Sequence, residues 1–186
     1  MTLRRGFKKE ANEIALEVRR DLSLRAHDPL DVLAVARSLE IPVVSLKSLA
    51  ATVPGDVHHF HVVEPNAFSA LTVFHEPARL IVYNDRHSQA RRASDIAHEL
   101  SHALLLHVPH RALDENGCRV WAAECEEEAE WLGGTLLIPD EAAVLIVREK
   151  LTLSDAASRY GVSRDMVTFR LNVSGARVRV ARAGRR

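Results

Sequence analysis

The stretch AHELSHALLLH, residues 97–107, contains a His-Glu-x-x-His pattern and lies near the middle of a 186-residue chain. On an α-helix, residues four apart lie one above the other, so His98 and His102 can direct both imidazoles at one ion. Glu99 is one residue further round and could reach a water molecule beside that ion without binding the ion itself. The stretch is therefore typical of the zinc-binding helix of a metallopeptidase.

A solvated helix that carries histidines by chance is the alternative interpretation. The same helix has an apolar side, which includes Ile96, Leu100 and Leu104. Two histidines next to a buried side are costly unless they have partners. The surrounding residues therefore favour a metal site.

A catalytic zinc ion takes three protein ligands and one water molecule, so a third ligand is expected from a neighbouring element. The run CEEEAEWLGG, residues 125–134, belongs to a helix predicted over about residues 119–132, with Gly133-Gly134 softening its end. The candidate ligands in and beside this run are Glu124, Glu126, Glu127, Glu128 and Glu130. Glu126 lies next to the apolar side of the helix and could point inward, with Glu130 one turn on. The run could also be a solvated acidic face, and the residues alone do not choose between Glu126 and its neighbours.

The elements around the motif predict an α+β fold. Amphipathic helices are expected over residues 7–22 and from Asp28-Pro29, as N-cap and first residue, to about residue 39. Strands are expected in PVVSL (42–46), DVHHFHVV (56–63), FSALTVF (68–74) and RLIVYN (79–84). Further helices follow over residues 88–107, 119–132 and 140–147. We expect a small mixed sheet packed against a helical metallopeptidase core that binds zinc.

The C-terminal part has a pattern of its own. Thr152 and Asp155 resemble a capping box, Gly161 suits a left-handed helix end, and Ser163 caps a second helix. This predicts a helix-turn-helix-like element over residues 150–175, after a metallopeptidase domain over 1–149 and before a basic tail over 176–186.

DNA binding by this element is possible but not favoured. Its second helix offers Arg164 and Arg170, which Asp165 offsets, and helices of this kind often only pack or bind protein. The arginines of the tail could form an arm that contacts phosphates, or a disordered end.

Composition excludes several classes of protein. Apolar residues make up 47% of the chain, which is enough for a core, and 25 basic residues balance 25 acidic ones. This balance argues against a generally basic nucleic-acid binder. No signal-peptide pattern and no membrane-spanning run is evident, and Cys118 and Cys125 are too few for a disulfide framework. A cytoplasmic protein with reduced thiols is expected.

Three stretches in order, RLIVYND (79–85), AHELSHALLLH (97–107) and EEEAEWLGGTLLIP (126–139), resemble the ImmA/IrrE family of metallopeptidases. The resemblance covers about residues 10–172. It implies zinc as the cofactor, His98, His102 and Glu126 as its ligands, and Glu99 as the catalytic residue. Glu126 is implied because the family ligand lies four residues before an asparagine, a position that Glu130 occupies here. Glu130 could hydrogen-bond His98 from outside the ligand set, or compete as a ligand.

The resemblance also implies a function. Members of the family are cytoplasmic zinc-dependent endopeptidases that cleave or inactivate a partner regulator, here expected to be a helix-turn-helix repressor or an antitoxin. Glu99 would take the proton of the attacking water and pass it to the leaving amine. The alternatives are the toxin of a toxin–antitoxin pair and a non-catalytic transcription regulator that contains zinc.

Other side chains near the expected strands are weaker candidates. His58, His59, His61 and His75 could include one that polarises a substrate carbonyl, although surface histidines are the more ordinary interpretation. Tyr83 could donate a hydrogen bond to an oxyanion, but packing on its strand is the more ordinary role.

Overall fold

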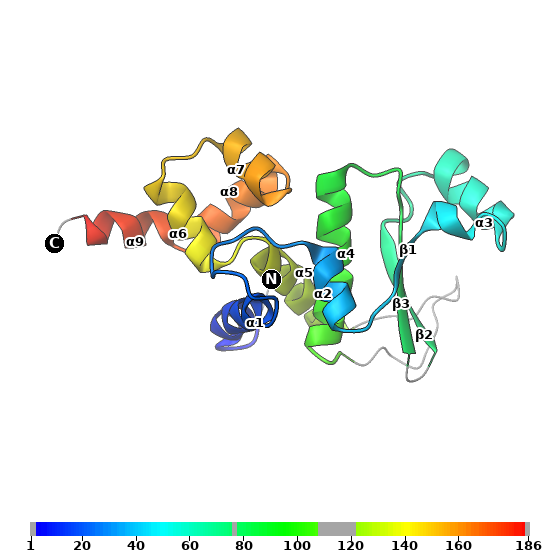
Figure 1. The fold of residues 1–186 in the computed structure, drawn as a ribbon, viewed down its shortest axis with the longest axis horizontal. Helices are drawn as coiled ribbons and strands as arrows, with labels where there is room; N and C mark the ends of the chain where they lie inside the picture. The colour runs from blue at the N-terminus through cyan, green and yellow to red at the C-terminus, as the bar shows by residue number, and fades with distance from the viewer. Residues whose placement is uncertain (1–2, 76–77, 108–121, 185–186) are drawn as a thin grey trace.

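The computed structural model describes residues 3–75, 78–107 and 122–184, and over these residues the chain is a mixed α+β protein. A small sheet lies towards one end, and a long helix, α4 (Gln89–Leu104), stands between the sheet and most of the other helices (Figure 1). The main core runs from the sheet through α4 into these helices. The predicted fold class is confirmed at this level.

The sheet has three strands in the order β1-β3-β2. β1 (Val43–Ser45) pairs in parallel with β3 (Ala78–Tyr83), and β2 (Ala70–His75) pairs with β3 in antiparallel fashion. Successive side chains of a strand point to opposite faces. Ile81 joins the main core with α4, whereas Val82 joins a second, smaller core on the other face. Three of the four predicted strands are therefore present.

The prediction of a strand in DVHHFHVV (56–63) is wrong. These residues form α3 (Pro54–His58) and a π-helical turn, η2 (His59–Val63), and with the 3-10 turn η1 (Leu46–Leu49) they cover the outer face of the sheet. Pro54 occupies the first helical turn, where its missing N–H is not needed. Val57 and Phe60, three residues apart, then pack on the same small core. The spacing of the apolar residues is thus helical.

The N-terminal helices are α1 (Phe7–Asp21) and α2 (Val32–Ser38). The prediction of Asp28-Pro29 as the start of the second helix is wrong, because the N-cap is Asp31, whose side chain accepts from the Leu33 N–H at 2.9 Å. Asp28 instead accepts hydrogen bonds from Arg25. Asp31, which lies three residues after Asp28, caps α2 instead.

Helix α5 (Ala123–Leu137) does not weaken at Gly133-Gly134, contrary to expectation, but continues through both glycines. Both are buried where the helix crosses its neighbours. A Cβ on Gly133 would lie 3.2 Å from the backbone nitrogen of His98, so α5 and α4 meet backbone to backbone at this point. The glycine therefore fixes the distance between the two helices that carry the motif and the glutamate run.

Alanine substitutions at the two glycines are expected to differ. Gly133→Ala should destabilise the protein by about 1–3 kcal/mol relative to Gly134→Ala, the usual cost of overpacking. A Cβ at 133 meets the backbone of α4, whereas a Cβ at 134 meets the flexible Met166 side chain at 3.3 Å. Both changes gain similar helix propensity, so denaturant unfolding of the pair isolates the contact. Equal stability of the two variants would contradict it.

The C-terminal helices are α6 (Asp140–Arg148), α7 (Leu153–Tyr160), α8 (Arg164–Val173) and α9 (Ala176–Ala183). The predicted local signals are present: the Thr152 and Ser163 side chains cap α7 and α8, and Gly161 ends α7 with φ 65°. Residues 176–183 of the expected tail form α9, which excludes a disordered end over that range. Arg185 and Arg186 lie outside the described residues.

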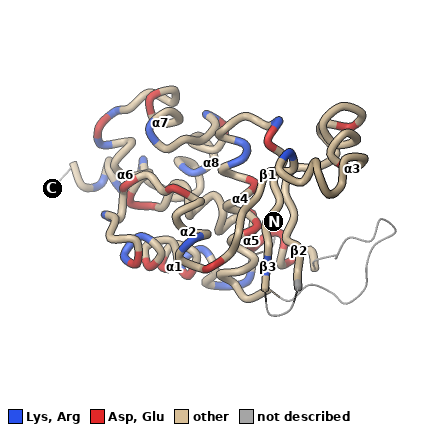
Figure 2. The backbone as a smooth tube through the Cα atoms, turned by 45° about the vertical axis from the view of Figure 1, so that its right-hand side comes forward, with Lys and Arg blue, Asp and Glu red and all other residues tan. Residues whose placement is uncertain are grey.

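Helix α8 packs into the body of the protein through a buried arginine. Arg170 is 1% exposed and donates to the Ile138 carbonyl at 2.8 Å and to Asp140 at 3.1 Å. It is therefore committed to the interior and cannot contact DNA. Helices α6, α7 and α8 each carry both basic and acidic residues, whereas α9 carries three arginines and no acidic residue (Figure 2). Among the residues described, no helix has the length and apolarity needed to cross a bilayer.

Candidate metal centre

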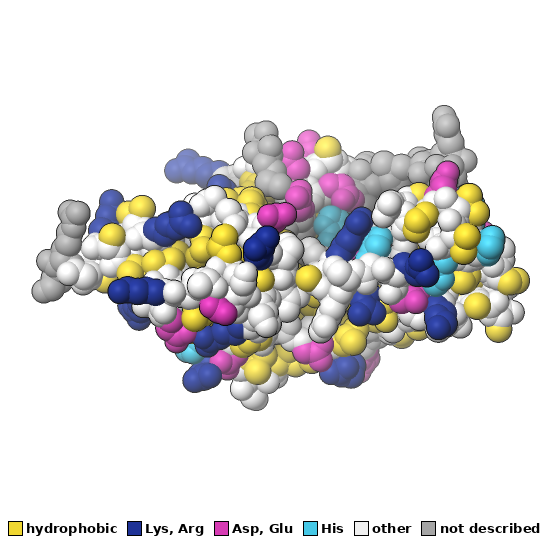
Figure 3. Space-filling view, turned by 90° about the horizontal axis from the view of Figure 1, so that it is seen from above, with side chains coloured by type: hydrophobic (Ala, Val, Ile, Leu, Met, Phe, Trp, Pro, Cys, Tyr) yellow, Lys and Arg dark blue, Asp and Glu magenta, His cyan; other side chains and the backbone are white. Residues whose placement is uncertain are grey.

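Three side chains from two helices bring metal-binding atoms together. His98 and His102 lie one turn apart on α4, with their Nε2 atoms 3.2 Å apart. Glu126, in the first turns of α5, lies 3.2 Å from His98 Nε2 through one carboxylate oxygen and 3.5 Å from His102 Nε2 through the other. One donor atom of each residue lies within 4.8 Å of the others. Histidine and acidic side chains meet in a hollow on one face of the molecule (Figure 3).

This donor set fits a zinc ion. Zinc ligands at 2.0–2.2 Å in tetrahedral geometry lie roughly 3.3–3.5 Å from one another. The two Nε2 atoms are 3.2 Å apart, each lies 3.2 or 3.5 Å from a different Glu126 oxygen, and one donor atom of each residue lies within 4.8 Å of the other two. Two imidazole nitrogens and one carboxylate are also a donor combination found in catalytic zinc sites, which keep a fourth position open. The cluster could therefore bind a metal with little rearrangement.

Charge and burial set the protonation states of the three groups. Burial lowers the pKa of His102 to about 3, helped by the nearby His98, so its ring is neutral at ordinary pH. For His98, burial lowers the pKa, but the hydrogen bond with Glu126 and the nearby carboxylate charges have the larger combined effect. The pKa of His98 is therefore raised. The same hydrogen bond lowers the pKa of Glu126. Glu126 is thus held as a carboxylate, the form that binds a cation.

Glu99 lies beside the cluster without belonging to it. Its carboxylate accepts a hydrogen bond from the Thr72 hydroxyl of β2, and burial raises its pKa. A carboxylate with a raised pKa, next to a metal-binding cluster, is suited to take up and release a proton. Thr72, which no motif singled out, fixes the direction of this side chain.

The other carboxylates of the glutamate run lie elsewhere. Glu124 and Glu130 are exposed, and Glu127 and Glu128 are partly buried. Within the described part of the chain no hydrogen bond joins Glu130 to His98, although its charge helps to raise the His98 pKa. Of the five candidates, the structure brings Glu126 to the two motif histidines.

Sequence reasoning missed two residues that extend the site outward. His107 Nδ1 lies 3.0 Å from Nδ1 of His102, and His107 Nε2 lies 3.5 Å from a carboxylate oxygen of Glu128. The motif helix was expected to reach His107 but ends at Leu104; on a continued helix, His107 would have pointed to a different side from His102, so no contact was expected. Glu128 was considered only as a metal ligand.

The weaker candidates lie away from the cluster. His58, His59 and His61 belong to α3 and η2 on the outer face of the sheet, and His61 approaches Asp85 at 3.2 Å. Cys125 is a free, partly buried thiol whose pKa burial raises. Cys118 and the His75 side chain lie outside what the structure describes.

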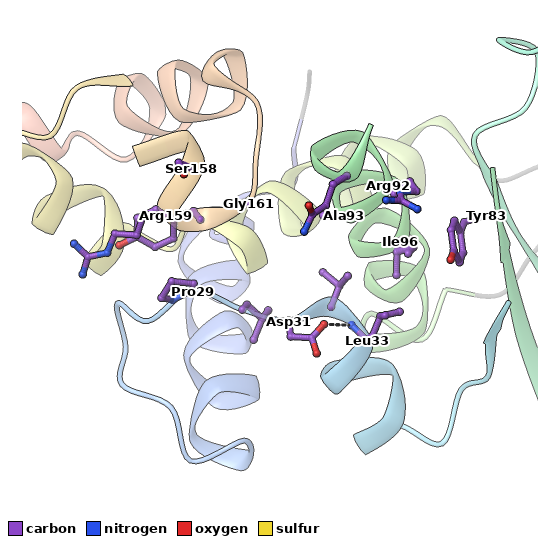
Figure 4. A pocket seen from close by; sticks show the side chains of 14 residues that line it. Pro29, Asp31, Leu33, Tyr83, Arg92, Ala93, Ile96, Ser158, Arg159 and Gly161 are labelled. Atoms are coloured by element: carbon purple, nitrogen blue, oxygen red, sulfur yellow. Dashed lines mark hydrogen bonds between the residues drawn. The ribbon is translucent and has the colours of Figure 1, made fainter. Parts of the chain in front are cut away.

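Tyr83 lines a separate pocket between α2, α4 and α7, of about 640 Å³ (Figure 4). Helix α4 contributes Arg92, Ala93 and Ile96 to this pocket. These residues and His98 lie on different sides of the helix by the 3.6-residue repeat. Tyr83 is therefore not placed to stabilise charge at the metal cluster.

The comparisons with known proteins point to one family. The model of the Peptidase_M78 family, described as the IrrE N-terminal-like domain, matches residues 41–172. The match spans well over half of the chain and includes both helices of the cluster. No individual curated protein matches the chain by sequence.

Proposed function

We propose that this chain, which belongs to the Peptidase_M78 family of IrrE N-terminal-like domains, is a zinc-dependent endopeptidase. It would act in the cytoplasm and cleave or inactivate a partner transcriptional regulator. Membership makes a metallopeptidase function the starting point, since this is a zinc-dependent peptidase family. The observation that carries the proposal is the cluster of His98, His102 and Glu126 with Glu99 held separately beside it.

In this proposal each side chain has one task. His98, His102 and Glu126 would hold zinc, which supplies Lewis acidity to the scissile carbonyl and to a water molecule. Glu99 would take a proton from that water as its oxygen attacks the carbonyl carbon. The same carboxyl group would then give the proton to the amide nitrogen as the C–N bond breaks. Thr72 would keep the Glu99 carboxylate oriented during both transfers.

Strand β2 is a suitable support for an extended substrate. It lies at an edge of the described three-stranded sheet, and Thr72 links it to Glu99. An edge strand offers backbone N–H and C=O groups to which an extended peptide can add as a further strand. Leu71 and Val73 on the same strand are partly exposed, at 36% and 43%. We infer that the substrate backbone lies along β2.

The family resemblance and the C-terminal helices both support a protein as the partner. With Arg170 buried, α8 lacks one of the two arginines that could have contacted DNA. This supports a role in packing or protein binding over DNA reading. A helix-turn-helix repressor or an antitoxin, encoded beside this gene, is the proposed substrate.

The proposal is tested by incubating the zinc-loaded protein with the regulator encoded beside its gene and analysing the products by mass spectrometry. We expect one or a few cuts, which a chelator stops and added zinc restores. An intact regulator would favour the non-catalytic zinc-containing transcription regulator instead. Growth arrest on expression that requires Glu99, with the regulator uncut, would favour the toxin.

A further inference from the structure

We infer that His107 and Glu128 position His102 for metal binding, in a relay made of the His102–His107 hydrogen bond and the contact of the His107 ring with the Glu128 carboxylate. The inference rests on the metal centre of the proposed function and deepens it. Neither outer residue belongs to the His-Glu-x-x-His motif or to the cluster. His107 contacts His102 directly because of how α4 ends, and Glu128 contacts His107 from α5.

A helix-ending turn folds His107 back over His102. Leu106 has φ 53°, a left-handed conformation that a leucine adopts only at a cost. The His107 N–H then donates to the His102 carbonyl at 3.0 Å, and the Leu106 N–H donates to the Ala103 carbonyl at 3.1 Å. This is the hydrogen-bond pattern of a Schellman motif, which brings together the side chains at these two positions. Here those side chains are the two histidines.

The contact between the rings restricts their tautomers. Nδ1 of His102 and Nδ1 of His107 are 3.0 Å apart, so one must donate a proton and the other accept it. If His102 donates, its proton is on Nδ1 and its Nε2 lone pair faces His98 and Glu126, ready for a metal. If His107 donates, neutral His102 carries its proton on Nε2 and cannot be a ligand there.

Glu128 selects the first arrangement. When His102 donates, His107 carries its own proton on Nε2, which lies 3.5 Å from a Glu128 oxygen. The opposite arrangement would turn a nitrogen lone pair towards that carboxylate, which is unfavourable. The other Glu128 oxygen accepts from Arg4 at 2.7 Å, so the carboxylate is held in place from the N-terminal segment. The relay therefore favours the metal-binding tautomer of His102.

The relay predicts a loss of metal affinity without loss of any ligand. His107→Phe keeps a ring but removes both nitrogens, and should weaken zinc binding by about 10–100-fold, the usual effect of losing a group that orients a ligand. Glu128→Gln keeps the shape, removes the charge and should weaken binding by a smaller factor. His107→Gln retains one acceptor and donors, so its affinity should be closer to wild type than to His107→Phe. Zinc affinity is measured by chelator competition on the full chain.

Matched controls separate this inference from the metal site itself. His58→Phe and Glu124→Gln change exposed residues of the same types and should leave zinc affinity unchanged. His98→Ala should strip the metal; if it does not, the metal centre of the proposed function is wrong. If His98→Ala strips zinc but His107→Phe and Glu128→Gln, folded by circular dichroism, bind it within about twofold of wild type, the relay alone is wrong. Visible spectra of the cobalt-loaded variants should change for His107→Phe and not for His58→Phe.

Discussion

Glu99→Gln is expected to retain zinc and to lose turnover by about 100-fold or more, the scale of a positioned acid–base group. The glutamine has nearly the same shape and can still accept a hydrogen bond from Thr72, so the local structure should persist. It cannot take the proton of the attacking water. Because Glu99 is not one of the three clustered donors, no metal ligand is lost. The measurement is regulator cleavage by both proteins at matched zinc content.

A control keeps this result specific. Glu124→Gln makes the same chemical change at an exposed glutamate and should cleave at the wild-type rate. A site that only stabilises the fold predicts another pattern, in which Glu99→Gln leaves every biological effect intact. Equal relief of repression by wild type and Glu99→Gln would therefore refute the peptidase mechanism and favour protein binding through the C-terminal helices.

Glu126→Ala should remove most of the bound zinc, because the carboxylate is the only acidic member of the cluster found in the described residues. The loss should exceed the roughly 10–100-fold expected when a group outside the ligand set is removed. Metal content after dialysis against a weak chelator, measured by elemental analysis, checks this.

The neighbouring glutamates supply the comparison. Glu124→Ala and Glu130→Ala change exposed side chains, and Glu127→Ala changes a partly buried one on the same helix. All three should retain zinc near the wild-type level. Zinc loss in Glu130→Ala or Glu127→Ala, together with full zinc in Glu126→Ala, would show that the assignment of the third ligand is wrong.

Features with local causes were predictable from the sequence. Ser88, Thr152 and Ser163 each cap the helix that follows, and Gly161 ends α7 in the left-handed conformation that glycine favours. The spacing of His98 and His102 is likewise a local property of one helix. These signals depend on residues within a few positions of one another, so one chain is enough to read them.

Features that depend on the rest of the fold were not predictable. Gly133 in isolation indicates a weak helix, but in the structure it allows α5 to lie against α4 at His98. That contact helps to fix which side of α5 faces the histidines, and so which glutamate reaches them. From the residues alone the glutamate run left this choice open, and only the family resemblance singled out Glu126.

The same reasoning applies to the wrong strand and to the relay. DVHHFHVV was predicted as a strand, but Pro54 and the small core on the outer face of the sheet select a helix. His107 reaches His102 only because Leu106 adopts a positive φ. The residue type at this position does not predict that conformation. Arg170 was considered as a residue that could contact DNA. Instead, it donates a hydrogen bond to the carbonyl of Ile138, which lies between α5 and α6.

The central claim is that zinc is held by three protein side chains and keeps a position open for water and substrate. X-ray absorption spectroscopy at the zinc edge of the loaded protein tests it most directly. The account predicts two imidazole nitrogens and light oxygen ligands at about 2.0–2.2 Å, with one oxygen exchangeable for an added inhibitor such as a hydroxamate. A closed shell of four protein ligands that the inhibitor does not perturb would contradict it.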